Sequence, residues 1–269
     1  MKLLTRMTDY SKTIRLAPVL CPSYPRSIYF HCYWNGQLNE KHFYSILSCH
    51  YFHQEQHTII LWLENNIPND WNDKIKPLAQ IRPFILNNEK KEFDNRLSYS
   101  TPHSIPFHSD FIRLLLLYNY GGCWFDLDIF FLRNFNGLFY HFGNEICVYQ
   151  WETQNYPNNA IFISLEPQSK SMKHIIEFLL ERQCGFGFQV AQLTYDLPLD
   201  LFVLPCSWFD PDWIPNPYPT SWDQFFEHTD MLYNWTNFFP HSFCYHWHNR
   251  WEKEIQPNCI LLQLVQKII

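Results

Sequence analysis

The sequence predicts an α/β protein with a mostly parallel central sheet flanked by helices. The order of the predicted elements indicates this class, and the length and composition indicate a single domain. Residues 27–33 and 57–64 are runs of β-forming residues separated by a segment with helical spacing, which is the strand–helix–strand order of a parallel sheet. The chain has 269 residues, of which 46% are hydrophobic, so it can bury the core of one large domain. We therefore expect a single domain over residues 1–269.

The first three elements are predicted from their residue patterns and from the turn and capping residues at their ends. Residues 27–33, SIYFHCY, precede the turn-like pair Asn35-Gly36, so a strand is expected there. A helix is expected over 38–51, with Asn39 as a plausible N-cap. Residues 57–64, HTIILWLE, form a continuous apolar run, which is typical of a strand buried on both faces.

A helix is predicted over 108–120, ending at Gly121-Gly122. Its N-cap is expected at one of its first two residues, and Asp110 then lies in the first turn, where the helix dipole favours a negative charge. Arg113 follows three residues later, so Asp110 and Arg113 share a face and their side chains can meet.

The other predicted elements are less marked. Residues 81–88 are a weaker strand candidate, because Pro83 removes a hydrogen-bond donor. Further along the chain we expect a strand running into a loop at 123–131, strands at 145–152 and 159–165, and a helix at 172–182.

The C-terminal third is rich in Pro and Trp, and residues 208–226 predict long ordered loops. The last segment, 259–269, predicts an amphipathic helix that docks on the domain, with attachment to a membrane surface as the alternative. Four acidic residues near these loops are candidates for work on the acceptor side, although such residues are usually solvated: Glu152, Asp196, Asp210 and Asp212.

Composition excludes some classes of protein. The net charge is −6 and no cluster of Lys and Arg stands out, which argues against nucleic acid as a partner. Nine Cys occur without a CxxC pair or zinc spacing, so reduced thiols in a cytosol-like compartment are expected. Neither a signal-peptide core nor a membrane-spanning apolar window is found. We expect a cytoplasmic protein without a transmembrane segment.

Residues 121–130, GGCWFDLDIF, place two carboxylates in an apolar run. In an extended chain Asp126 and Asp128 point to the same side, and their repulsion favours a cation between them. The pair also stands at a strand end, where open α/β sheets place ligand sites. The alternative is a local Asp110–Arg113 salt bridge beside two solvated aspartates.

The segment SDFIRLLLLYNYGGCWFDLDIF resembles the signature of glycosyltransferase family 32, the group with a DXD motif. It is also similar to the α1,4-galactosyltransferases, the yeast initiating mannosyltransferase and the catalytic domain of the large clostridial glucosylating toxins. The resemblance implies a GT-A fold and retaining transfer from a nucleotide sugar. It also implies a nucleotide-sugar-binding half at about 27–130 and an acceptor-side half at about 131–269.

The resemblance implies roles for the residues of this motif. Asp128 would be a metal ligand, and Asp126 would reach the ribose, the sugar or the metal of the donor. Asp110 and Arg113 would hold the donor sugar and the neighbouring phosphate. A divalent cation such as Mn²⁺ or Mg²⁺ agrees with this, because it takes oxygen ligands and neutralises charge on a leaving diphosphate.

Two more blocks extend the resemblance toward the nucleotide sugar. In IYFHCYWNGQLNE, residues 28–40, Trp34 matches an aromatic that stacks on uracil, and a place in the core is the alternative. Asn158 and Asn159 match the family's Asn that hydrogen-bonds the donor sugar, and either of them could be that residue.

The last block is YHWHNRW at 245–251, which resembles the late motif whose His completes the metal shell. His246 is favoured over His248, because Trp251 falls five residues after it. The residues just before Trp251 differ from the small and Ser residues of the family, and Arg250 among them could contact the diphosphate directly.

The predicted function is a metal-dependent, retaining glycosyltransferase that uses a UDP-linked hexose and a glycan or glycoconjugate acceptor, as in polysaccharide biosynthesis. Front-side attack is expected, because no carboxylate is placed as a covalent nucleophile. A HAD-like phosphatase is one alternative, but Ile129-Phe130 replace the residues that should follow its motif. A non-catalytic nucleotide-sugar or glycan-binding module is the other.

Overall fold

The structure is a computed structural model of the chain. It describes residues 5–6, 26–54, 56–90, 93, 105–151, 156–182, 201–213 and 224–269, with the backbone alone at 5–6, 66, 105–108, 182 and 213. The acceptor-side candidates Glu152 and Asp196 lie outside the described residues.

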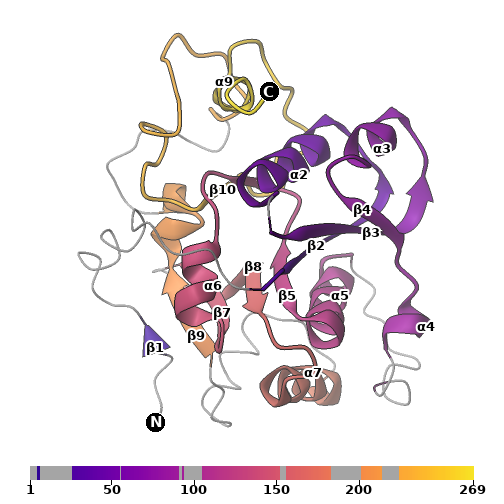
Figure 1. The fold of residues 1–269 in the computed structure, drawn as a ribbon. Helices are drawn as coiled ribbons and strands as arrows, with labels where there is room; N and C mark the ends of the chain where they lie inside the picture. Colours follow the sequence, from indigo (N-terminus) through magenta and orange to yellow (C-terminus); the bar gives the residue numbers. More distant parts are fainter. Residues whose placement is uncertain are drawn as a thin grey trace.

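A central sheet of eight strands has the order β1-β9-β7-β8-β5-β2-β3-β4 (Figure 1). The bounds of its strands are β1 Thr5–Arg6, β2 Tyr29–Gln37, β3 Thr58–Ile67, β4 Gln80–Pro83, β5 Gly122–Phe125, β7 Ile146–Gln150, β8 Asn158–Ser164 and β9 Leu201–Pro205. Neighbouring strands are parallel except at β8, which is antiparallel to both β5 and β7. The prediction of a mostly parallel sheet is confirmed.

Helices cover both faces of this sheet, as Figure 1 shows. Their bounds are α2 Glu40–His53, α3 Asp70–Ile75, α4 Leu86–Glu89, α5 Ile105–Tyr120, α6 Asn136–Phe142, α7 Lys170–Arg182 and α9 Ile260–Val265. On one face Phe30 and Leu61 pack with α2, α3 and α6, and on the other Ile60 packs with α5 and α7. This explains the continuous apolar run of β3, whose side chains are buried alternately on the two faces.

The helix before the double glycine begins earlier than the sequence predicts. α5 starts at Ile105, so the predicted N-cap at His108 or Ser109 is wrong, and Asp110 lies in its second turn. The physical reason is that Pro106 is tolerated in the first turn, where backbone N–H groups have no intrahelical partner. Because Asp110 lies in the second turn, it does not cap the helix, and its side chain can contact residues outside the helix.

Two other expectations differ from the structure. Strand β4 ends at Pro83 and a short helix, α4, follows, so the predicted strand over 81–88 is half as long. Strand β9 was not predicted within the C-terminal third, which was expected to be loops. β4 lies at the edge of the sheet, where the missing N–H of Pro83 is tolerated.

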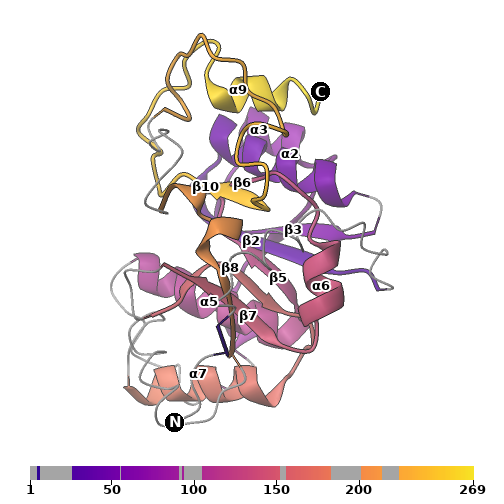
Figure 2. The ribbon, with the colours of Figure 1, turned by 90° about the vertical axis from the view of Figure 1, so that its left-hand side faces the viewer.

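A second, smaller sheet carries the C-terminal part of the chain. β10 (Cys244–His246) pairs antiparallel with β6 (Ile129–Phe131), so residues just after the carboxylate doublet lie beside the late aromatic block. α9 packs on α2 and on this small sheet, which confirms the predicted docked helix (Figure 2). Among the described residues, every helix is too short or too polar to cross a membrane.

Candidate active site

The carboxylate doublet lies in a turn between β5 and β6. Ile129 N donates to Asp126 O at 3.1 Å, and Asp126 N donates to Ala160 O at 2.9 Å. The prediction that Asp126 and Asp128 point to the same side of an extended chain is therefore wrong, because the chain must turn here for β6 to pair with β10. The prediction that the doublet follows a strand end is confirmed, since β5 ends at Phe125.

Arg113 joins three of the predicted residues in one network. Its Nη2 lies 3.2 Å from Asp126 Oδ1 and 3.4 Å from Asp110 Oδ1. Its Nη1 donates to the carbonyl of Asn159, and Asn159 Nδ2 donates to Asp110 Oδ1 at 2.7 Å. Side chains from α5, the end of β5 and β8 therefore meet at one point.

Trp124 contacts both Asp126 and Arg113 of this network. Its Nε1 donates to Asp126 Oδ1 at 2.7 Å, and the Arg113 guanidinium lies 5.0 Å from its ring centroid. Burial raises the pKa of Asp126 to about 6, with Arg113 and Trp124 opposing the rise and Asp128 adding to it. The orientation of Asp126 is thus fixed by two donors on the same carboxylate oxygen.

Asp128 is held by the loop that follows β10. Its Oδ2 accepts from Asn249 N at 2.7 Å and lies 3.1 Å from His246 Nε2. Trp247 N also donates to the Asp128 carbonyl at 3.0 Å. In the described part of the chain both of these side-chain contacts fall on Oδ2.

The backbone of this loop has an unusual conformation. His248 and Asn249 are consecutive residues in the left-handed region, with φ of 52° and 57°. This conformation directs the N–H of Asn249 toward Asp128. Non-glycine residues are held in this region only where the surrounding structure imposes it, and such positions cluster at functional sites.

Within the protein, the charges of the doublet are already balanced. Burial alone would raise the pKa of Asp128 and lower that of His246, but their contact lowers the first and raises the second. Arg113 faces Asp126, and the imidazole of His246 faces Asp128. Repulsion within the doublet therefore does not by itself require an external cation.

A comparison with protein families gives the decisive observation. Residues 39–150 match the glycosyltransferase sugar-binding region containing a DXD motif, and the match includes Asp126 and Asp128. This segment is a DXD-type glycosyltransferase region, and the protein is a glycosyltransferase. The phosphatase and the non-catalytic module are thereby set aside. A search of curated proteins finds no match.

Solved structures of glycosyltransferases resemble the fold. The PaToxG glycosyltransferase has a TM-score of 0.51 at 16% identity, over 70% of this chain and 76% of that one. An active-site mutant of LgtC has a TM-score of 0.48 at 11% identity, over 81% and 86% of the two chains. GlyE from Streptococcus pneumoniae has a TM-score of 0.45 at 11% identity and is covered over 46% of its length, less than half. The fold of this glycosyltransferase is of the GT-A class.

The doublet and His246 have donor chemistry that fits a divalent cation. Carboxylate oxygens suit Mn²⁺ and Mg²⁺, and an added imidazole nitrogen favours Mn²⁺. Asp128 and His246 are both buried and lie beside each other. DXD glycosyltransferases generally use a divalent metal and a nucleotide sugar. The residues present therefore fit such a metal, provided that His246 is neutral when it binds.

Trp34 and Trp251 belong to one aromatic cluster. Their ring centroids are 5.1 Å apart, and the buried His42 stacks on Trp251 at 4.5 Å. Asp128 has an electrostatic effect on His42, which places this cluster on the metal side of the site. Lys41 Nζ donates to the carbonyls of Arg250, Trp251 and Lys253, so the N-terminus of α2 holds the loop that carries Trp251.

The structure separates the two remaining predicted residues from the network around Arg113. Asn158 Oδ1 accepts from Ala160 N at 2.7 Å, a local contact within β8, whereas Asn159 is the one that contacts Asp110. Arg250 Nη1 lies 3.9 Å from Glu252 Oε1, and its side chain is 38% exposed. Asn159 is therefore the better candidate of the asparagine pair, and Arg250 lies on the loop after His248.

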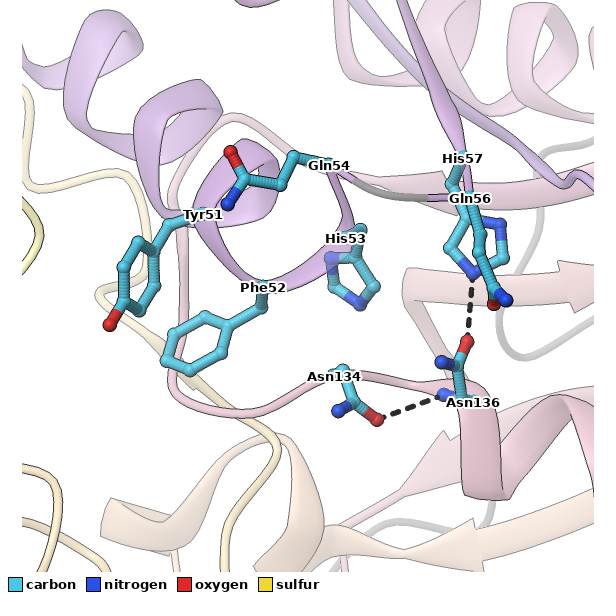
Figure 3. Close-up of a pocket in the computed structure, with 8 residues that line it drawn as sticks. All are labelled: Tyr51, Phe52, His53, Gln54, Gln56, His57, Asn134 and Asn136. Atoms are coloured by element: carbon cyan, nitrogen blue, oxygen red, sulfur yellow. Dashed lines mark hydrogen bonds between the residues drawn. The ribbon is translucent and has the colours of Figure 1, made fainter. Parts of the chain in front are cut away.

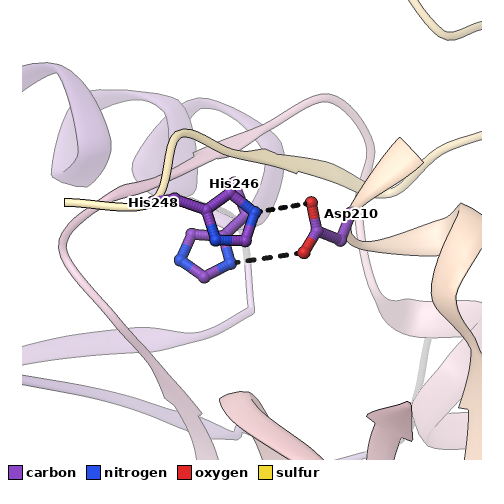
Figure 4. A group of neighbouring side chains, drawn as sticks. All are labelled: Asp210, His246 and His248. Carbon is purple, nitrogen blue, oxygen red and sulfur yellow. Dashed lines mark hydrogen bonds and ion pairs between the residues drawn. The ribbon is translucent and has the colours of Figure 1, made fainter. Parts of the chain in front are cut away.

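Sequence reasoning missed Asp210. It was expected to be solvated but is completely buried, with His246 Nδ1 at 3.7 Å and His248 Nε2 at 2.9 Å from its two oxygens (Figure 4). Among the described residues these three side chains are the group of His, Cys, Asp and Glu that could surround a metal. A carboxylate within the aromatic segment WFDPDW was the signal that could have revealed it.

A separate pocket opens between the end of α2 and the β6–α6 connection (Figure 3). It is lined by Tyr51, Phe52, His53, Gln54, Gln56, His57, Asn134 and Asn136. The imidazole of His57 hydrogen-bonds Asn136 Oδ1 at 2.8 Å across it. None of the predicted site residues lines this pocket, so it is not part of the candidate active site.

Proposed function

We propose that this glycosyltransferase is metal-dependent and retaining, and that it transfers a hexose from a UDP-linked donor to a glycan or glycoconjugate acceptor. The observation that carries the proposal is the placement of the Asp128–His246 pair next to the Asp126–Arg113 pair. One pair has the chemistry to hold a cation, and the other has the chemistry to hold a phosphorylated sugar. Binding of a nucleotide sugar through its diphosphate requires both of these pairs.

Asp128, His246 and Asp126 would hold Mn²⁺, or Mg²⁺ in its place. When bound, the cation would neutralise the charge that develops on the leaving diphosphate. Asn249 N–H and the backbone around it keep Asp128 in place before the donor arrives. Such preorganisation is where most of the electrostatic stabilisation in an enzyme originates.

Asp110, Arg113 and Asn159 would bind the donor sugar. Asp110 accepts hydrogen bonds and can therefore hold sugar hydroxyl groups, while Arg113 supplies positive charge for the neighbouring phosphate. Arg113 is 4% exposed and contacts both carboxylates, so it positions them relative to each other. Its role is orientation as well as charge.

The nucleotide would lie against the aromatic cluster. Trp34 is partly exposed and would stack on the base, with Trp251 beside it. Arg250, on the same loop, would approach the diphosphate, and Asn158, at the start of β8, would contact the donor sugar. We further propose one domain in which about 27–130 forms most of the nucleotide-sugar site and about 131–269 forms the acceptor side, with Asn159, His246 and the loop after His246 reaching the donor.

Retention would follow from attack of the acceptor on the same face that the diphosphate leaves. Asp110 and Asp126 are both paired with Arg113, which makes them poor nucleophiles. Catalysis would then come from positioning and from stabilisation of the leaving group. A reducing, cytoplasmic location is part of the proposal, supported by buried thiols in the described part of the chain that form no disulfide, among them Cys32, Cys49 and Cys123.

A donor assay tests the proposal. Purified protein is incubated with UDP-hexoses and Mn²⁺, and release of UDP is measured. We expect release that EDTA and Asp128→Ala abolish. Asp73→Ala is the matched control, since Asp73 is 77% exposed and pairs with Lys76 far from the site. Release that persists in EDTA and in Asp128→Ala would remove the metal from the proposal.

A further inference from the structure

Asp210 is a buried carboxylate with no part in the function proposed above. It follows the short 3₁₀ helix Cys206–Trp208, and its backbone is fixed by a hydrogen bond from its N to Cys206 O at 2.8 Å. Its side chain is completely buried. A carboxylate in such a position is stable only if donors surround it.

Two N–H groups hydrogen-bond the Asp210 carboxylate, and the imidazole of His246 lies beside it. Trp151 Nε1 donates to Oδ2 at 2.6 Å, and His248 Nε2 lies 2.9 Å from Oδ1. His246 Nδ1 lies 3.7 Å from Oδ2, and the rings of His246 and His248 stack with centroids 3.9 Å apart (Figure 4). These contacts hold the pKa of Asp210 below its usual range in spite of burial.

His246 therefore lies between two carboxylates. Its Nε2 faces Asp128 at 3.1 Å, while its Nδ1 faces Asp210 and the Tyr149 hydroxyl, which lies 3.1 Å away. A histidine that binds a metal through Nε2 must be neutral and must keep its proton on Nδ1. A carboxylate on the Nδ1 side is the usual means of fixing that tautomer.

We propose that Asp210 is a positioning residue that keeps the proton of His246 on Nδ1 and so presents the Nε2 lone pair to a divalent cation at Asp128. His248 holds Asp210 from the other side and fixes the plane of the His246 ring by stacking. The inference rests on the proposed metal dependence and adds the group that orients its nitrogen ligand.

Direct binding of the metal by Asp210, His246 and His248 is the competing arrangement. The ligand atoms of these residues lie within 4.8 Å of one another. However, His246 Nε2 points to Asp128, and Trp151 already donates to Asp210 Oδ2. The position of Asp210 behind His246 therefore favours orientation over ligation.

Mn²⁺ affinity, measured on the full chain by electron paramagnetic resonance without any donor, tests the inference. Asp210→Asn should weaken Mn²⁺ binding by about 10-fold to 100-fold, whereas Asp128→Ala should abolish it. Asp212→Asn is the matched control. It changes a carboxylate two residues away that accepts from Tyr245 Oη at 2.7 Å, and it should leave the Mn²⁺ affinity unchanged.

A measurement on the unmodified protein covers the case in which Asp210→Asn fails to fold. In ¹⁵N-histidine-labelled protein loaded with Mg²⁺, the ring proton of His246 should be found on Nδ1, with the assignment taken from His246→Gln. A proton on Nε2 would overturn the inference.

The other outcomes are also decisive. Equal Mn²⁺ affinity in the wild-type protein and Asp210→Asn overturns the orienting role and leaves the proposed function intact. Complete loss in Asp210→Asn, as in Asp128→Ala, overturns it in favour of direct ligation. If Asp212→Asn weakens Mn²⁺ binding as much as Asp210→Asn does, the loss of affinity reflects disturbed packing, and the orienting role of Asp210 is overturned. If the wild-type protein binds no metal, the metal-dependent function itself fails and the orienting role fails with it.

Discussion

Arg113 is the residue on which the geometry of the site depends most. Its guanidinium contacts Asp110, Asp126 and the carbonyl of Asn159, and it lies over the ring of Trp124. These contacts use the planar fork of several donors, which a lysine cannot reproduce. Position 113 therefore requires the shape of the guanidinium group as well as its positive charge.

Arg113→Lys should lower kcat/KM for donor turnover at least tenfold, about 1.4 kcal/mol of transition-state stabilisation. The reason is that Asp110 and Asp126 lose their common partner while the charge is kept. Arg82→Lys is the control, because Arg82 Nη2 donates to Gln80 on the edge strand, away from the site. Unchanged turnover in Arg113→Lys would show that the bridge is not needed.

At this scale the sequence predicted the residues of the site better than their surroundings. The motif located Asp110, Arg113, Asp126 and Asp128, because a local pattern of charges and glycines carries that information. It could not locate Asp210, since the contact with His246 joins two segments distant in sequence, which meet where Phe243 N donates to Trp208 O beside β10.

The turn between α5 and β5 is the element that delivers these residues. Gly121 and Gly122 have φ of 65° and 118°. A Cβ at Gly121 would lie 2.4 Å from the Leu165 carbonyl oxygen, and one at Gly122 would lie 2.2 Å from that of Tyr29. The helix can therefore pass into the strand only because both side chains are absent.

Gly122→Ala should reduce the free energy of unfolding by about 3 kcal/mol, from the combined backbone strain and overlap. Urea denaturation measures it. Gly36→Ala is a matched control, because Gly36 has φ of 122° but its Cβ would meet only Trp34 Nε1 at 3.8 Å. It should cost about 1 kcal/mol from strain alone. Equal losses in the two variants would contradict the role of close packing.

Elements with a strong hydrophobic period or with clear capping and turn residues were predicted. Elements that depend on pairing with strands distant in sequence were not. The α2 N-cap at Asn39 and the end of α5 at the double glycine follow from local chemistry and are confirmed. The turn at the doublet and strand β9 depend on partner strands distant in sequence. Local propensity cannot reveal such partners.

At the scale of the whole molecule, three buried histidines link stability to pH. Burial lowers the pKa of His31 to about 4 and those of His42 and His53 to about 3. The ring nitrogens of His31 contact Gly121 O and the Trp62 indole N–H, so one donates, the other accepts and the ring is neutral. In the unfolded chain these rings titrate near 6.5.

The free energy of unfolding should therefore fall as pH falls below 6.5, because the unfolded chain binds protons that the folded protein excludes. Asp126, with a pKa raised to about 6, and His246, with a pKa raised to about 10, act in the opposite direction, but they are two groups against three. We expect a loss on the order of 3 kcal/mol between pH 7 and pH 5, measured by urea denaturation. Equal or greater stability at pH 5 would contradict this.

The central claim is that Asp128 and its neighbours hold a cation shared with the diphosphate of the donor. The most direct test is the coupling between Mn²⁺ and UDP, measured by calorimetry as the affinity of each with and without the other. We predict that Mn²⁺ raises UDP affinity at least tenfold, that UDP raises Mn²⁺ affinity by the same factor, and that Asp128→Asn abolishes the coupling. UDP binding of equal strength in Mn²⁺ and in EDTA would contradict the account.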